Sequence, residues 1–271
     1  MSLKEFDLAG KAAVVIGGGR GIGKGIALTL AEAGADVIVA ARTAEQVKQT
    51  ASEIRSLGRE GIAVPADATK ADDTDKVISA AISAWGRVDI LVNSAGLAIR
   101  KPIVPLPGYR PAWAEAVQDF SSPTNEEEWR HMLDANLTSI FLATRAAGPY
   151  MIQQGKGKII NITSATGAKG FAYQVVYCTT KAAVSMYTRS LALEWARYNI
   201  NVNALAPGYV ATEMTAMFFE NEAVRDRLLR SVPLSRLGQP REVGLLAVYL
   251  ASEASDYLTG QTIYLDGGLL A

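Results

Sequence analysis

Short apolar runs alternate along the chain with longer segments in which apolar residues recur at helical spacing. The runs predict β-strands at 11–17, 36–41, 61–67, 88–96, 157–164, 200–208 and 261–268. The longer segments predict helices at 21–34, 43–58, 70–86, 134–154, 175–198 and 240–252. Because the strands are apolar on both faces, we predict an α/β fold. It is a single doubly wound Rossmann-type domain over 1–271, with a parallel sheet of about seven strands and helices on both faces.

Composition narrows the class of protein. The 271 residues carry 27 Lys and Arg against 27 Asp and Glu, and nucleic-acid binders usually show a basic excess instead. The single cysteine excludes an intramolecular disulfide and fits a reducing compartment. The first residues do not resemble a signal peptide, and no apolar stretch approaches the roughly 20 residues of a membrane span. We expect a soluble, cytoplasmic protein with no nucleic-acid, membrane or metal partner.

The stretch IGGGRGIGKG, residues 16–25, joins the first predicted strand to the first helix. Glycine tolerates positive φ and lets the backbone approach a phosphate, and the helix N-terminus adds unpaired N–H groups. The spacing of Gly17, Gly21 and Gly23 departs from G-x-G-x-x-G, for which Gly17, Gly19 and Gly21 are a partial substitute. The context favours a dinucleotide site over a turn that serves only strand-to-helix geometry.

The end of the second strand indicates which dinucleotide is bound. A carboxylate about 20 residues after the glycines would accept from a ribose 2′-hydroxyl, but Ala41 stands there and Arg42 follows. A guanidinium suits a 2′-phosphate, and Arg20 can supply a second one. This pattern favours NADP(H) over NAD(H), unless both arginines are ordinary surface residues.

Tyr177 and Lys181 share one face of a predicted helix because they are spaced i, i+4. An ammonium beside a phenol lowers the pKa of the phenol, which then suits acid–base catalysis near neutral pH. Such pairs are common on surfaces, but Ser164 ends the preceding strand at the same sheet edge. The three residues together predict a general acid–base site.

Motifs along the whole chain resemble those of the short-chain dehydrogenase/reductase superfamily, in its single-domain branch with a YxxxK active site. In order they are GGGRGIG (17–23), DAT (67–69), NSAG (93–96), DANL (134–137), NITS (161–164), YCTTK (177–181), PGYVAT (207–212) and YLDGG (264–268).

The resemblance implies a role for each matched residue. Tyr177 would exchange a proton with the substrate oxygen, Ser164 would hydrogen-bond the same oxygen, and Lys181 would tune Tyr177 and hold the nicotinamide ribose. Asn136 would keep a water on Lys181 as a proton relay, and Asp67 would meet the adenine. The implied cofactor-binding residues are Gly17, Gly19, Arg20, Gly21, Ile22, Gly23, Arg42, Asp67, Ala68, Asn93, Ala95, Gly96, Tyr177, Lys181, Pro207, Gly208, Val210 and Thr212.

Two positions depart from the family pattern. Ile16 stands where a threonine hydroxyl usually ties the first turn to the fourth strand, and Ser94 stands where asparagine is common. Both departures bear on local rigidity rather than on activity. The resemblance also implies a homo-oligomer, a dimer or a tetramer.

Two variable segments bear on the substrate. Residues 97–125 are an inserted loop, either a wall or lid of the site or a surface excursion against a neighbouring subunit. Residues 209–238 form a substrate-side loop and helices. Their apolar residues Met214, Met217, Phe218 and Phe219 either close over a ligand or belong to the core.

The expected function is the reversible, NADPH-dependent reduction of a small ketone, apolar or cyclic, to an alcohol. One alternative is the reduction of a 3-oxoacyl thioester on acyl-carrier protein or CoA, which would need a basic docking patch. An alternative of another class is a non-catalytic dinucleotide-binding sensor or scaffold. The intact set of Asn136, Ser164, Tyr177 and Lys181 disfavours that alternative.

Overall fold

The structure, a computed structural model, describes residues 3–108 and 122–271, with the backbone alone at 217–220. Within this range all strands form one parallel sheet in the order β3-β2-β1-β4-β5-β6-β7. Their bounds are β1 Ala12–Ile16, β2 Asp36–Ala41, β3 Gly61–Pro65, β4 Ile90–Asn93, β5 Gly157–Ile162, β6 Ile200–Pro207 and β7 Thr262–Leu265. The sheet confirms the predicted fold class.

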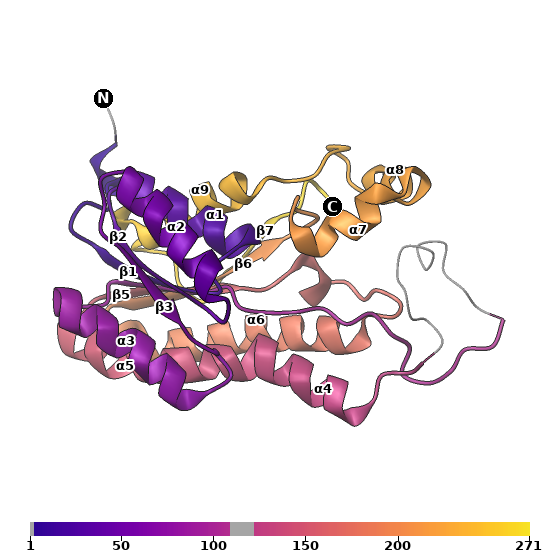
Figure 1. Ribbon diagram of the computed structural model, residues 1–271, viewed down its shortest axis with the longest axis horizontal. Helices are drawn as coiled ribbons and strands as arrows, with labels where there is room; N and C mark the ends of the chain where they lie inside the picture. The colour runs from indigo at the N-terminus through magenta and orange to yellow at the C-terminus, as the bar shows by residue number, and fades with distance from the viewer. Residues whose placement is uncertain (1–2, 109–121) are drawn as a thin grey trace.

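Helices cover both faces of the sheet (Figure 1). One layer holds α1 (Gly21–Glu32), α2 (Ala44–Ser56) and α9 (Pro240–Ala251). The other holds α3 (Ala71–Trp85), α5 (Ser139–Gln154) and α6 (Val175–Trp195). Each layer buries its own apolar core against the sheet. In β1, for example, Ala13 and Val15 belong to one core while Val14 and Ile16 belong to the other, because successive side chains of a strand point to opposite faces.

The strand order reverses at β1, which pairs with β2 on one side and with β4 on the other. The carboxyl ends of β1 and β4 lie side by side there, with Ile16 opposite Asn93. In open parallel sheets this reversal leaves a crevice beyond the strand ends, where ligands bind. The chain segments that follow β1 and β4 are therefore the walls of the expected site.

The helix predicted at 134–154 begins earlier than its sequence pattern indicated. It starts as α4 (Glu126–Leu133), passes through a π turn at Asp134–Thr138 and continues as α5. The start is set by Asn125, whose side chain accepts from the Glu128 amide at 2.8 Å while the Glu128 carboxylate accepts from the Asn125 amide at 3.1 Å. This reciprocal cap satisfies two otherwise unpaired donors. The prediction missed it because the polar run NEEE lacks apolar periodicity.

The inserted segment 97–125 is fastened at both ends. The Thr124 amide donates to the Pro102 carbonyl at 2.8 Å, and the Lys101 ammonium lies 2.6 Å from the Glu128 carboxylate on α4. The part of the predicted wall or lid at 109–121 lies outside the described residues. The second variable segment, 209–238, contains α7 (Glu213–Glu220) and α8 (Glu222–Arg230).

Gly17 makes a close contact that no other residue can replace. Its φ is +81°, and a Cβ there would lie 2.5 Å from the amide nitrogen of Ala95. Gly58, with φ +78°, has nothing within 4 Å of the same position, so it isolates the cost of the left-handed backbone. We expect Gly58→Ala to lower the free energy of unfolding by about 1 kcal/mol. Gly17→Ala should lower it by a further 1–3 kcal/mol or so, the usual cost of overpacking.

Urea unfolding monitored by circular dichroism measures both losses. Equal losses at the two positions would contradict the argument that the contact with Ala95 is what constrains Gly17.

Candidate functional site

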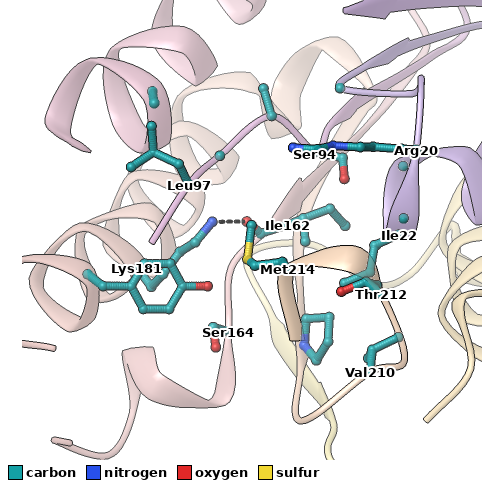
Figure 2. Close-up of a pocket in the computed structure, with 18 of the residues that line it drawn as sticks. Arg20, Ile22, Ser94, Leu97, Ile162, Ser164, Lys181, Val210, Thr212 and Met214 are labelled. Carbon is teal, nitrogen blue, oxygen red and sulfur yellow. Dashed lines mark hydrogen bonds between the residues drawn. The ribbon is translucent and has the colours of Figure 1, made fainter. Parts of the chain in front are cut away.

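A cavity of about 720 Å³ opens at the carboxyl edge of the sheet, between the glycine turn, the ends of the central strands and the start of α7 (Figure 2). Most residues that the sequence assigned to a site line it. They are Gly17, Gly19, Arg20, Gly21, Ile22, Gly23, Arg42, Asp67, Ala68, Ala95, Gly96, Ser164, Tyr177, Lys181, Pro207, Gly208, Val210 and Thr212.

Asn93, which was expected to line the cofactor, is not among the residues that line the cavity. Its side chain is buried within β4 and donates to the Asn161 side chain on β5 at 2.8 Å. Asn161 donates in turn to the Thr188 hydroxyl on α6 at 2.9 Å. The Asn93 Nδ2 thus links β4 to β5, while its buried Oδ1 has no hydrogen-bond partner.

Asn136 lies in the π turn and also stands outside the cavity lining. Its Oδ1 accepts from the Leu97 amide at 2.8 Å, and its Nδ2 donates to the Leu97 carbonyl and to the Thr180 hydroxyl, each at 3.0 Å. A Cβ at Gly96 would lie 2.9 Å from Asn136 Oδ1 and 3.5 Å from Lys181 Nζ, so the amide and the ammonium approach the same point. Asn136 thus joins the segment after β4 to α6 beside Lys181.

The glycine turn meets the requirements of a diphosphate cradle. Arg20 precedes α1 without a side-chain cap, and the first turn of the helix carries no acidic residue. The first amides of α1 are therefore unpaired by side chains, and Gly21, Ile22 and Gly23 line the cavity. Unpaired amides and the helix dipole favour an anion at this point.

Backbone hydrogen bonds replace the tie that Ile16 was expected to lose. The Ser94 amide donates to the Ile16 carbonyl at 2.8 Å, and the Gly17 amide donates to the Ala40 carbonyl at 2.7 Å. The turn is thus fastened to β4 and β2 without a hydroxyl at position 16.

The two arginines proposed for a 2′-phosphate have different surroundings. Burial acts to raise the pKa of the Asp67 carboxyl. Hydrogen bonds from the amide and hydroxyl of Thr69, together with the charge of Arg42, act to lower it and outweigh burial, so the pKa lies below its ordinary value. Arg42 therefore lies near Asp67. Arg20 instead pairs with Glu213 on α7, with 2.6 Å between Nη1 and Oε2.

Ser164, Tyr177 and Lys181 meet at the wall of the cavity formed by β5 and α6. Ser164 caps a single 3₁₀ turn at Ala165–Gly167, and its Oγ accepts from the Thr166 amide at 3.2 Å. Lys181 Nζ donates to the Ile162 carbonyl at 3.0 Å, the dashed line in Figure 2, and lies 5.8 Å from the centre of the Tyr177 ring.

The electrostatics of these groups differ from the expectation that Lys181 would lower the pKa of Tyr177. Burial raises the pKa of Tyr177, against a hydrogen bond with Ser164 and the charge of Arg100, which both act to lower it. Burial also lowers the pKa of Lys181 to about 8. The phenol is therefore held in its neutral form, and Arg100 is a cation that acts on it.

Arg100, His131 and Arg227 line the cavity, and the sequence analysis assigned none of them to the site. Burial lowers the pKa of Arg100, while Tyr177 and Tyr209 act to raise it, so the guanidinium lies close to both phenols. His131 comes from α4 and Arg227 from α8, on the side of the molecule away from α2 (Figure 1). No local signal marked Arg100, because a basic residue in a loop is usually exposed.

The described part of the chain offers neither a membrane span nor a metal site. None of its helices has the length and apolar character needed to cross a membrane. Within 3–108 and 122–271, no group of three or more His, Cys, Asp or Glu side chains is arranged to hold a metal ion.

Comparisons with known proteins agree with this geometry. A family profile described as "Enoyl-(Acyl carrier protein) reductase" matches residues 17–270. The chain is 39% identical, over the full length of both proteins, to the 2-dehydro-3-deoxy-D-gluconate 5-dehydrogenase of Escherichia coli. It is 35% identical to a 3-oxoacyl-[acyl-carrier-protein] reductase of Staphylococcus epidermidis, over 96% of this chain and 98% of that one.

A solved structure shares the fold over nearly the whole chain. It is a gluconate 5-dehydrogenase from Burkholderia cenocepacia in complex with NADP and tartrate, 35% identical, with a TM-score of 0.85. The match covers 98% of this chain and 97% of that one.

The pKa of Lys181 predicts how stability depends on pH. The amine has a pKa of about 8 in the folded protein and 10.5 as its ordinary value, so between these values the unfolded chain binds more protons. Stability contributed at this position therefore rises with pH across that window, by at most about 1.4 kcal/mol per pH unit. We expect wild type to gain stability relative to Lys181→Met between about pH 8 and about pH 10.

Urea unfolding of both proteins at several pH values measures this difference. The carbonyl of Ile162 loses its partner in the variant at every pH, so that cost cancels from the slope. A constant difference across the window would contradict the shifted pKa.

Proposed function

Because the chain belongs to the short-chain dehydrogenase/reductase superfamily, we propose that it is an NADP(H)-dependent enzyme that interconverts a ketone and a secondary alcohol on a substrate bearing a carboxylate. Membership of this family shows the general activity: the chain is an NAD(P)-dependent oxidoreductase that acts on CH–OH and C=O groups. The cofactor preference, the residue roles and the substrate class are the proposal.

One observation carries the proposed chemistry. Ser164, Tyr177 and Lys181 line the same cavity as the glycine turn and its uncapped helix N-terminus. A cavity that joins a phosphate cradle to an acid–base group can hold a dinucleotide and a small reactant together, which removes the entropic cost of their encounter. A sensor or scaffold would need the cradle but not the acid–base group.

The bound nicotinamide supplies or accepts the hydride. In reduction, the Tyr177 phenol donates its proton to the carbonyl oxygen, and burial keeps that phenol protonated until it is needed. The Ser164 hydroxyl donates to the same oxygen as negative charge develops on it. In oxidation, both residues act on the alcohol in reverse.

Lys181 stabilises the phenolate that Tyr177 becomes. With a pKa of about 8, its ammonium is charged at neutral pH and can return a proton to the phenolate. Asn136 lies beside Lys181 at Gly96, where a water between them would complete the relay to solvent.

The preference for NADP(H) rests on Arg42. No carboxylate stands at the end of β2 to accept from a 2′-hydroxyl, and Arg42 lines the cavity next to Asp67. A planar guanidinium binds a phosphate through two hydrogen bonds. The related gluconate 5-dehydrogenase holds NADP, which supports the same choice here.

The substrate class rests on the charge of the cavity near Tyr177. Arg100 lies close to that phenol, and Arg227 and His131 approach from α8 and α4. We expected an apolar substrate from Met214, Met217, Phe218 and Phe219. Met214 lines the cavity, and the side chains of the other three lie outside the described part of the chain. The guanidinium groups of Arg100 and Arg227 in the cavity lining nevertheless favour a substrate with a carboxylate, such as a hydroxy or keto acid. The tartrate bound to the gluconate 5-dehydrogenase is a hydroxy acid as well.

A 3-oxoacyl thioester is the second candidate substrate. The family profile and the Staphylococcus epidermidis relative support it, since both are described as reductases that work on acyl-carrier protein. Assays with a keto acid and with a 3-oxoacyl thioester distinguish the two candidate substrates. In the thioester the carboxyl group is esterified, so it has no free carboxylate for the cavity to bind.

Tyr177→Phe removes the proposed acid while keeping the ring. We expect the rate of ketone reduction to fall by about 10²–10⁴-fold, the usual contribution of general acid catalysis. Binding of NADPH, measured by fluorescence, should change little. Tyr187→Phe is the matched control, because Tyr187 lies on the same helix, and its half-buried phenol stands outside the cavity lining. Turnover retained by Tyr177→Phe would contradict the assigned role.

Arg100→Gln tests the substrate class. A lost charged hydrogen bond should lower kcat/KM for a keto acid by about 10- to 100-fold. The neutral amide of the same acid should be affected far less. Arg225→Gln is the control, because Arg225 pairs with Glu222 and Asp226 on α8 and does not line the cavity. Equal losses on acid and amide would mean that Arg100 serves Tyr177 instead of a carboxylate.

A further inference from the structure

Arg20 lies between two walls of the cavity. The residue before it, Gly19, packs on the end of β2, where an added Cβ would lie 3.4 Å from Ala41 Cβ. The residue after it, Gly21, packs on the start of α7, where an added Cβ would lie 3.5 Å from Thr212 Cγ2. Arg20 therefore lies next to Glu213, which follows Thr212, and shares the cavity lining with Arg42, which follows Ala41.

Its side chain pairs with Glu213, at 2.6 Å between Nη1 and Oε2. Both side chains are more than half exposed and line the cavity, so a ligand there can reach the pair. Figure 2 shows Arg20 and Thr212 on the same side of the pocket, opposite Lys181.

Glu213 is held in place by the first turn of α7. The Thr215 hydroxyl accepts from the Thr212 amide at 3.1 Å and donates to the Val210 carbonyl at 2.6 Å. Val210 also forms a bridge with Gly238, which fixes the strand end that leads into the helix. The backbone that carries Glu213 is therefore fixed at the start of α7, and its carboxylate meets Arg20 through two long, exposed side chains.

We propose that Glu213 is a specificity-determining residue whose carboxylate competes with the 2′-phosphate of NADP(H) for Arg20. The inference rests on the proposed function, in which that phosphate binds beside Arg42. When NADP(H) binds, Arg20 leaves Glu213 and joins Arg42 on the phosphate. When NAD(H) binds, Arg20 stays on Glu213, so the competition weakens NADP(H) alone.

Glu213→Gln removes the competing charge and keeps the size of the side chain. Exposed ion pairs contribute little in water, so we expect the dissociation constant of NADPH to fall by only about two- to five-fold. The dissociation constant of NADH should stay unchanged. Both are measured by fluorescence titration at low and at high salt, and the gain for NADPH should shrink at high salt because screening weakens the pair.

A double-mutant cycle with Arg20→Gln and a control variant, Glu32→Gln, complete the test. In an Arg20→Gln background, Glu213→Gln should have no effect on either cofactor, because the contested group is gone. Glu32→Gln removes a matched ion pair, Glu32–Arg241 at 2.6 Å, from outside the cavity, and should leave both dissociation constants unchanged.

Each other outcome overturns the inference. Equal changes in the dissociation constants of NADPH and NADH would mean that the Arg20–Glu213 ion pair only joins two walls of the cavity and does not respond to the 2′-phosphate. Weaker NADPH binding by Glu213→Gln would mean that Glu213 positions Arg20 for the phosphate. Arg42→Gln separates the two levels of the argument. If Arg42→Gln weakens the binding of NADPH and NADH alike, the proposed 2′-phosphate site is wrong. If it weakens NADPH alone, the phosphate site stands, and a negative result for Glu213→Gln then contradicts only the proposed competition.

Discussion

The glycine turn and the end of β4 meet through backbone alone, and the cavity depends on that contact. Gly17 leaves no space for a Cβ against Ala95, and Gly23 leaves none against the carbonyl of Gly17. A larger residue at either position would push α1 away from the strand reversal between β1 and β4, where both phosphate and substrate have to lie. The turn contains glycines, which are poor helix formers, because any side chain at Gly17 or Gly23 would increase the distance between the start of α1 and the ends of β1 and β4.

The charge that serves the chemistry is buried on the opposite wall and is held by few contacts. Lys181 donates to the Ile162 carbonyl, and Asn136 fixes the neighbouring segment through Leu97 and Thr180. Burial raises the pKa of Tyr177 above its ordinary value and lowers that of Lys181 to about 8, so the ammonium becomes the stronger acid of the two. The same desolvation that destabilises each charge therefore favours the return of a proton from the Lys181 ammonium to a Tyr177 phenolate.

Much of this arrangement was predictable from the sequence, because it depends on periodicity and on local motifs. Apolar runs located the strands, and the spacing of Tyr177 and Lys181 after Ser164 predicted three side chains that line one cavity. What escaped prediction depends on contacts between distant segments. Arg100 looked like an ordinary loop residue until folding placed it beside Tyr177, and the burial of Asn93 follows from pairing with Asn161 on the next strand. The start of α4 escaped because a polar cap, not an apolar stripe, defines it.

The hydrogen bond between Thr124 and Pro102 has a consequence for how such a protein can change over generations. The two groups meet at 2.8 Å, and the described residues between them, 103–108 and 122–123, belong to neither of the two large cores. The entropy of closing a loop grows only slowly with its length, so a change in the length of this stretch costs little in loop closure. The glycine turn tolerates no comparable change, because an added Cβ at Gly17 or Gly23 would collide with backbone atoms.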